Sequence, residues 1–147
     1  ALKPEFKDYI KSVLANAKIL SETLKNNGFK IYSGGTDSHL MLVDLRPFNV
    51  KGNLASESLS RANITCNKNG IPFDSESPMI TSGIRLGTQA ATTRGFGLKE
   101  FEKVGELITK TIKGLSKSPD DNSKIEDEVR SEVVDLCSNF PIYKHLR

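Results

Sequence analysis

Three apolar stripes with helical spacing constrain the fold of this chain more than any other feature of its sequence. Within each stripe the apolar residues recur at steps of three and four, which places them on one side of a helix. The stripes are Phe6, Ile10, Val13, Ala17, Leu20 and Leu24; Phe101, Val104, Ile108, Ile112 and Leu115; and Ile125, Val129, Val133, Leu136 and Phe140. Pro4 suits the first turn of the first helix, Gly28 suits the left-handed position past its end, and Ser123 with Glu126 matches a capping box for the third. Each stripe needs a partner surface.

Between the first two stripes the apolar pattern changes to that of short strands. Strand character is found in residues 29–32, 40–43 and 80–86. Residues 53–62 have the pattern of a short helix, whereas residues 63–78 show little periodicity, which in a compact domain is typical of a functional or disordered loop. We therefore expect an α+β fold, with a single domain over residues 1–147, in which helices cover one face of a small, mostly antiparallel sheet. The other face would be free to meet something else.

Composition and charge narrow the classes of function. The 147 residues are 37% hydrophobic and 27% charged, as in one ordinary globular domain, and no run of about 18 apolar residues predicts a membrane span. The net charge of +3 is far from the clustered basic footprint of a nucleic-acid domain. We expect neither nucleic acid nor a membrane as partner. Cys66 and Cys137 have no metal-ligand or disulfide spacing, so we expect no metal site and a reducing, cytoplasmic location.

An arginine inside a strand-like segment is the most informative polar residue. Arg85 stands among small and apolar residues between Gly83 and Gly87, and glycines allow a ligand or another backbone to approach closely. A guanidinium in such surroundings needs a partner, and its planar fork fits a carboxylate or phosphate. The alternatives are an internal salt bridge to Asp37 or Asp44, or exposure on an edge strand. The pattern alone favours these alternatives over an anion clamp.

Other polar segments are less specific. The amides of Asn67–Asp74 can bind a flat polar ring, although turn chemistry explains Asn beside Gly equally simply. The Gly34–His39 segment does not have the spacing of a phosphate loop, and His39 is either a general base or a structural histidine. Cys66 has no activating base, and Arg94–Gly95 binds an anion or begins a turn. No segment offers a catalytic unit, so we expect no catalytic residue here and no activity from this chain alone.

Five motifs at these positions resemble the carboxy-terminal region of serine hydroxymethyltransferases in order and spacing. They are Ser33-Gly34-Gly35-Thr36-Asp37-Ser38-His39, Arg61-Ala62-Asn63-Ile64-Thr65, Asn67-Lys68-Asn69, Ser82-Gly83-Ile84-Arg85-Leu86-Gly87-Thr88 and Thr93-Arg94-Gly95-Phe96. Each motif is weak by itself, but five in sequence are highly specific. The likeness extends over residues 4–143.

The resemblance implies the small domain of an aspartate-aminotransferase-like enzyme that uses pyridoxal 5'-phosphate. Members of the family interconvert serine and glycine, moving a one-carbon unit to or from the co-substrate tetrahydrofolate, and work as homodimers or larger assemblies with active sites between subunits. Their large domain holds most of the cofactor through a lysine in a threonine-rich stretch followed by His-Lys. This sequence has no such stretch, so we expect the large domain and its lysine to be absent from it.

The resemblance also assigns roles to individual residues. By position, Arg85 matches the arginine that binds the carboxylate of the substrate amino acid, which orients the bonds at its Cα against the cofactor ring. Asn69 matches a contact to the pterin ring of folate. Glu76, Ser77 and Pro78 occupy the place where family members also contact folate.

Two further positions receive supporting roles, and two segments depart from the family pattern. His39 and Arg94 match family positions near the site. Gln89 stands where a proline is usual, which would loosen that turn, and Lys51–Leu54 differs from the usual helix entry. The alternative hypothesis is a free-standing interaction or nucleic-acid-binding module. Because basic residues are scattered among acidic ones, the sequence disfavours it.

Overall fold

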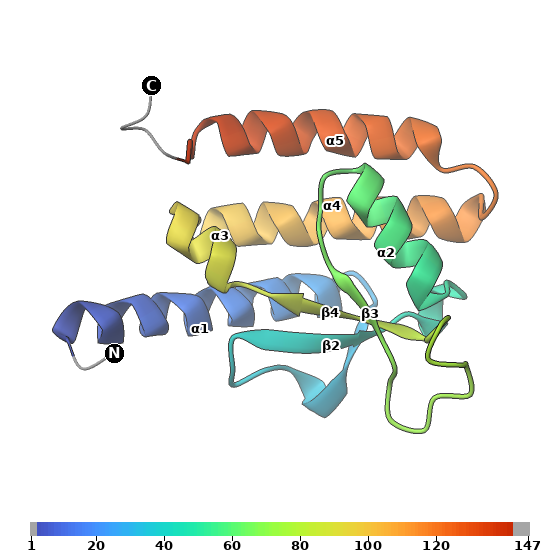
Figure 1. Cartoon of the computed structure of the whole chain (residues 1–147), viewed down its shortest axis with the longest axis horizontal. Coiled ribbons are helices and arrows are strands. Elements are labelled where there is room, and N and C mark those ends of the chain that lie inside the picture. The colour runs from blue at the N-terminus through green and yellow to red at the C-terminus, as the bar shows by residue number, and fades with distance from the viewer. Residues whose placement is uncertain (1–2, 143–147) are drawn as a thin grey trace.

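The computed structural model describes residues 3–142, which form five α-helices and a four-stranded sheet (Figure 1). The helices are α1 (Pro4–Asn26), α2 (Gly52–Arg61), α3 (Gln89–Arg94), α4 (Leu98–Lys117) and α5 (Ser123–Ser138). The strands are β1 (Lys30–Ile31), β2 (Leu40–Asp44), β3 (Asn67–Asn69) and β4 (Gly83–Gly87). Helix α5 lies over α4 on the side away from the sheet. The α+β prediction is confirmed.

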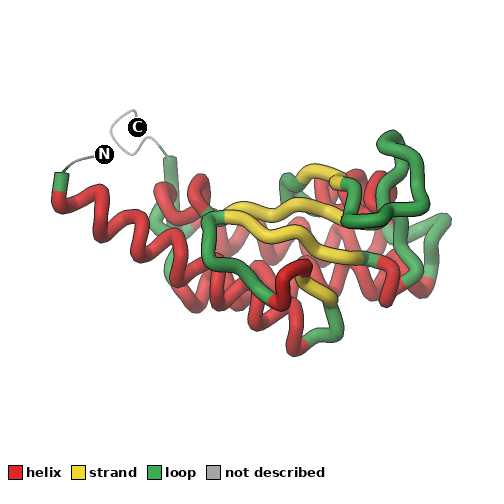
Figure 2. The backbone as a smooth tube through the Cα atoms, turned by 90° about the horizontal axis from the view of Figure 1, so that it is seen from below, coloured by secondary structure: helices red, strands yellow, loops and turns green. Residues whose placement is uncertain are grey.

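The sheet is antiparallel throughout the described chain, in the order β1-β2-β4-β3. The two five-residue strands β2 and β4 form its centre, and β3 and β4 are joined by a long loop, residues 70–82. Seen from below, the strands lie in front of the helices (Figure 2), so the helices cover one face only. This is the arrangement that the sequence predicts, with one sheet face open.

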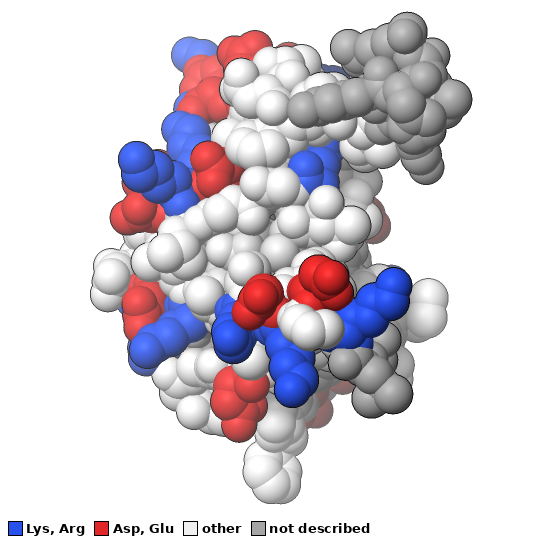
Figure 3. Space-filling view, turned by 90° about the vertical axis from the view of Figure 1, so that its left-hand side faces the viewer, with Lys and Arg blue, Asp and Glu red and all other residues white. Residues whose placement is uncertain are grey.

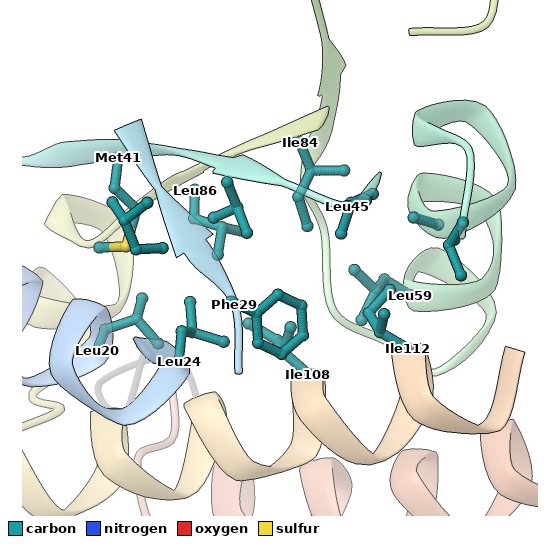
Figure 4. Close-up of a cluster of buried hydrophobic side chains, with 14 of the residues drawn as sticks. Leu20, Leu24, Phe29, Met41, Leu45, Leu59, Ile84, Leu86, Ile108 and Ile112 are labelled. Atoms are coloured by element: carbon teal, nitrogen blue, oxygen red, sulfur yellow. The ribbon is translucent and has the colours of Figure 1, made fainter. Parts of the chain in front are cut away.

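The core lies between the covered face of the sheet and helices α1, α2 and α4 (Figure 4). Val43 and Ile84 face each other across β2 and β4 and are fully buried, as are Leu59 from α2 and Ile112 from α4. Burying an aliphatic side chain of this size stabilises the fold by about 1.5–3 kcal/mol. The core therefore fixes the register of β2 and β4, because a one-residue slip would turn their apolar side chains to the open face.

The first helix extends beyond this core. Val13, Ala17, Leu20 and Leu24 are buried, whereas Phe6 and Ile10 of the same apolar stripe are exposed. In Figure 1 the first turns of α1 project past the sheet. Within the described chain, the polar contacts of these turns to α3 come from the Tyr9 hydroxyl, which lies 3.0 Å from Thr93 Oγ1 and 3.3 Å from the carbonyl of Gln89.

The predicted capping box of the third long helix is also wrong. Asn122, not Ser123, precedes α5, and the Glu126 carboxylate points instead toward α2. There it accepts bonds from Arg61 Nε at 2.7 Å and Nη2 at 2.8 Å and from Ser58 Oγ at 2.6 Å. Hydrogen bonds from Arg61 hold the pKa of Glu126 below its usual value although burial opposes them. This buried carboxylate thus joins α5 to α2.

Candidate functional site

The open face of the sheet is defined by alternate residues of its three longer strands. Ile84 and Leu86 point into the core, so Arg85 and Gly87 point away from it. The register places Arg85 directly opposite Leu42 on one side and Asn67 on the other. The guanidinium thus stands near the middle of the open face, not on the edge strand that the sequence left as an alternative.

Arg85 lines a cavity at this face. The cavity has a volume of about 380 Å³ and is open to solvent. Its lining is His39, Leu40, Thr65, Cys66, Asn67, Arg85, Leu86, Gly87 and Gln89. Arg85 Nη2 donates to Asn67 Oδ1 at 3.3 Å, which is a long bond and leaves most of the guanidinium donors free for a ligand.

Within residues 3–142, no carboxylate pairs with Arg85. Asp44, one of the two partners that the sequence allowed, accepts bonds from Arg46 Nε at 3.0 Å and Nη2 at 2.7 Å and lies 3.8 Å from Lys30 Nζ. Burial raises the pKa of Asp44, but bonds from Arg46 and the charge of Lys30 outweigh it and hold this pKa below its usual value. The alternative of an internal salt bridge for Arg85 is therefore wrong.

The glycines beside Arg85 have different roles. A side chain at Gly83 would come within 2.6 Å of Ile71 Cγ2 and 2.7 Å of the Val43 carbonyl, so this glycine admits the protein's own β2 and loop rather than a ligand. Gly87 is exposed on the open face, where its nearest neighbour is the flexible side chain of Gln89. Only Gly87 therefore keeps space free in the cavity.

His39 joins Arg85 at the same cavity. Its side chain is exposed, while its backbone carbonyl accepts from the amide of Thr88 at 3.0 Å and from Thr88 Oγ1 at 3.3 Å. Thr88 is fully buried and also donates to the carbonyl of Val13 at 3.0 Å. These bonds tie the residue before β2 to Thr88, and α3 begins directly after Thr88, at Gln89.

Asn69 lies on the same face at the opposite end of the site. It follows Asn67 by two residues on β3, a separation of about 7 Å along an extended strand. Its Nδ2 donates to the Gly70 carbonyl at 2.8 Å, so its side-chain oxygen has no protein partner among the described residues. Arg85 and Asn69 therefore share the open face, where Asn67, Asn69 and Arg85 form one polar strip, although Asn69 does not line the cavity.

The loop that carries Glu76, Ser77 and Pro78 begins where this strip ends. Glu76 forms an ion pair with Lys51, and the Ser77 carbonyl accepts from the amides of Ile80 at 3.0 Å and Thr81 at 2.9 Å. Pro78 is exposed. All three residues lie on ordered turns of this loop, beyond the Asn69 end of the strip and away from the His39 end.

One residue that the sequence did not single out holds this loop together. Asp74 accepts four hydrogen bonds, from the amides of Ile71 (3.1 Å), Glu76 (3.0 Å) and Ser82 (2.9 Å) and from Ser82 Oγ (2.6 Å). Burial raises the pKa of Asp74, but these four bonds outweigh it and leave that pKa far below its usual value. One carboxylate thus ties the start of the loop, at Ile71, to its end, at Ser82.

Arg94 stands apart from the cavity. Its Nε donates to the Phe140 carbonyl at 2.6 Å and its Nη2 to the Cys137 carbonyl at 3.1 Å, which satisfies the last turn of α5. It ends α3, and Gly95 follows with a φ of 113°, so this pair forms the turn before α4 that the sequence allowed. The structure does not bring Arg94 to Arg85.

The thiol of Cys66 lines the cavity, but burial raises its pKa to about 11, so it is neutral near pH 7 and a poor nucleophile. Sequence reasoning missed two contributors, Asn67 and Gln89. The side-chain alternation of β4 could have shown that Arg85 faces away from the core. Nothing local in the sequence pairs β3 with β4.

Among the described residues, neither the charge pattern nor the helix hydropathy outside the Arg85 cavity points to a further kind of site. On the face shown in Figure 3, lysines and arginines alternate with acidic residues around an uncharged centre. Among residues 3–142, no cluster of histidine, cysteine or acidic residues has the geometry of a metal site. None of the helices in this range combines the length and the apolar character needed to cross a bilayer.

Comparison with known proteins decides the family. The family model described as serine hydroxymethyltransferase matches residues 1–108, most of the chain. The chain belongs to the serine hydroxymethyltransferase family. Its relatives include proteins named serine hydroxymethyltransferase from Pelagibacter ubique, 87% identical over 147 residues, and from Paramagnetospirillum magneticum, 62% identical over 144 residues. A third, from a Marinomonas species, is 61% identical over 144 residues.

These serine hydroxymethyltransferases are much longer than this chain. The matches cover 98–100% of the chain but only 34% of each relative, so the chain spans about a third of their length. The prediction of the family is confirmed, and it was available from the five motifs. Two of the motifs contain strands β3 and β4 of the sheet. The other three lie directly before β2, at the end of α2 and at the end of α3.

Proposed function

We propose that this chain supplies the substrate-carboxylate clamp and part of the folate-binding surface of a serine hydroxymethyltransferase. The enzyme would convert serine and tetrahydrofolate reversibly into glycine and 5,10-methylenetetrahydrofolate, in one-carbon metabolism in the cytoplasm. The observation that carries this proposal is Arg85: an open cavity holds its guanidinium, and the described chain offers it no acid of its own. Family membership supports the reaction.

The clamp would act through geometry as much as through charge. The guanidinium presents a rigid fork that binds both oxygens of a carboxylate, so the amino acid is held in one orientation. A charged hydrogen bond of this kind is worth on the order of 1.5–3 kcal/mol, and fixed orientation accelerates the subsequent chemistry further. Strand β4, paired with β2 over the core, fixes the backbone from which the Arg85 side chain extends.

Folate would occupy the Asn69 end of the open face. The free amide oxygen of Asn69 can accept from a flat heterocycle, and the loop with Glu76, Ser77 and Pro78 borders that end. The four bonds to Asp74 hold this loop in one conformation, which lowers the entropy cost of binding. We assign His39 a supporting role in the clamp cavity and Arg94 a structural role at α5.

Pyridoxal phosphate would be held by protein outside this chain. The residues described here do not fit the cofactor, because each of their lysines is exposed or only half-buried at the surface, and the half-buried pair, Lys103 and Lys110, is engaged by Glu132. We therefore expect the chain alone to be inactive. Its large-domain partner and the second subunit of a homodimer would complete the site.

The test is Arg85→Lys in the Pelagibacter ubique relative, with this chain replacing the matching third; 87% identity makes the exchange conservative. Losing the fork should raise the KM for serine about 10- to 100-fold, the equivalent of ~1.5–3 kcal/mol. Arg130→Lys, an exposed position on α5, is the matched control and should leave KM unchanged. An unaltered serine KM in Arg85→Lys would refute the clamp.

A further inference from the structure

Asn67, the neighbour of Arg85 across strands β3 and β4, also bears on how a carboxylate is bound. We propose that Asn67 is a positioning residue: its neutral amide orients the Arg85 guanidinium without neutralising it, and the absence of charge at position 67 sets the affinity for a carboxylate. This inference rests on the proposed function of Arg85. It concerns a residue of the Asn67-Lys68-Asn69 motif to which neither the sequence analysis nor the family comparison assigns a role toward Arg85.

The register of the sheet makes Asn67 the direct cross-strand neighbour of Arg85. The two residues are paired across antiparallel β3 and β4 and point to the same open face. Both line the same cavity, and the Asn67 Oδ1 accepts from Arg85 Nη2 at 3.3 Å. On the other side, Leu42 of β2 offers no acceptor. Asn67 is thus the side-chain acceptor that fixes the rotation of the guanidinium within the described chain.

The chemistry of the acceptor decides what remains for a ligand. The Asn67 amide oxygen accepts one bond from Arg85 and carries no net charge, so the guanidinium keeps its full positive charge and most of its five N–H groups. An aspartate has almost the same shape but would form a charge-assisted, two-oxygen pair with arginine. A substrate carboxylate would then have to displace an internal one. An amide therefore suits a clamp that must be oriented yet remain free.

The surroundings of Arg85 support this interpretation. The cavity lining contains no acidic residue, and the ionisable groups that face Arg85 there are His39 and the neutral Cys66. The nearest acid along β2, Asp44, is engaged by two cations. An acid at position 67 would be the first carboxylate within reach of the clamp among the described residues. One substitution therefore tests the idea cleanly.

The experiment compares Asn67→Asp and Asn67→Ser in the same chimeric holoenzyme used for Arg85→Lys. For each variant, the dissociation constants of serine and of serinamide, which lacks the carboxylate, are measured by titration alongside kcat and KM. Asn67→Asp should weaken serine binding at least tenfold and serinamide binding less than threefold, with kcat within about threefold. Asn67→Ser, which loses only the orienting bond, should weaken serine about threefold. Asn49→Asp adds the same charge on an exposed residue outside the cavity and should change neither.

The outcomes separate this inference from the proposed function. If Arg85→Lys weakens serine but both Asn67 variants bind it as the parent does, Asn67 is not a positioning residue and the clamp stands. If Asn67→Asp weakens serine and serinamide equally, the substitution acts by distorting the site, and the charge argument is overturned. If Asn67→Asp does not fold, Asn67→Ser decides, because unchanged serine binding in that variant overturns the inference. Normal serine affinity in Arg85→Lys removes the basis of both proposals.

Discussion

Replacing Asp74 by alanine should loosen the loop between β3 and β4 and destabilise the whole chain. The substitution removes an acceptor of four hydrogen bonds at 2.6–3.1 Å and leaves three backbone amides and the Ser82 hydroxyl without it. Two of those bonds go to Ser82, which is buried and immediately precedes β4. The change therefore affects the strand that carries Arg85 as well as the loop.

The loss of unfolding free energy depends on which of the four donors can bond to water once Asp74 is removed. A hydrogen bond to a charged group contributes about 1.5–3 kcal/mol, but donors on an exposed loop recover most of this from solvent. Glu76 is half-buried, so its amide can reach water most easily, whereas Ile71 and Ser82 are buried. Counting only the two Ser82 bonds at the lower end gives a loss of about 3 kcal/mol, roughly a third of the stability of a typical domain.

Urea unfolding of the chain, followed by far-UV circular dichroism, measures this loss. Asp74→Asn keeps one acceptor oxygen and should lose less than Asp74→Ala, whereas Asp120→Ala, an exposed carboxylate in the turn before α5, should lose nothing measurable. Because folding lowers the pKa of Asp74, its contribution is complete above the unfolded value of about 3.9 and declines as pH falls below that value. Equal unfolding free energies for Asp74→Ala and Asp120→Ala at pH 7 would refute the reasoning.

Two further predictions concern the buried carboxylate of Glu126 and the thiol of Cys66. Glu126→Gln should lower the free energy of unfolding by about 2 kcal/mol, because it breaks the ion pair with Arg61. The Arg61 side chain is largely exposed, so water can solvate its charge once the pair is lost. A loss under about 0.5 kcal/mol would contradict this prediction. Folding lowers the pKa of Glu126, so this contribution should likewise be lost as pH falls below the unfolded value of about 4.3. In a Cys137→Ser background, iodoacetamide should modify Cys66 at pH 8 about a hundredfold more slowly than glutathione, because a pKa of about 11 leaves little thiolate. Comparable rates would show that the thiol is not desolvated.

The long helices could be predicted because their signal is local and repeated. Leu20 and Ile112 belong to stripes in which four or more positions agree, so an error at one residue does not change the helix. The ends of the stripes are less reliable as a guide to burial: Phe6 fits the spacing of α1 but is exposed, and its aromatic neighbour among the described residues is Tyr9. Periodicity tells which side of a helix is apolar. It does not tell how far the opposing surface extends.

The elements that sequence reasoning missed have no such redundancy. Strand β3 is the polar triplet Asn67–Asn69, and its strand conformation depends on pairing with β4 rather than on its own residues. Helix α3 has six residues and no apolar stripe. The Ser123–Glu126 spacing fits a capping box, yet Arg61, 65 positions away in sequence, offers the carboxylate a stronger partner. In each case a non-local contact overrides the local pattern.

The same distinction explains why the clamp was visible in the sequence and its surroundings were not. The pattern showed that Arg85 needed a partner but favoured an internal acid or an exposed position over an external anion. That choice depends on Arg46 and Lys30, which hold Asp44, and on the register that places a neutral amide beside the guanidinium. A charge becomes a binding site only when the fold supplies no counter-charge. The role that we propose for this arginine therefore depends as much on the residues that do not neutralise it as on the arginine itself.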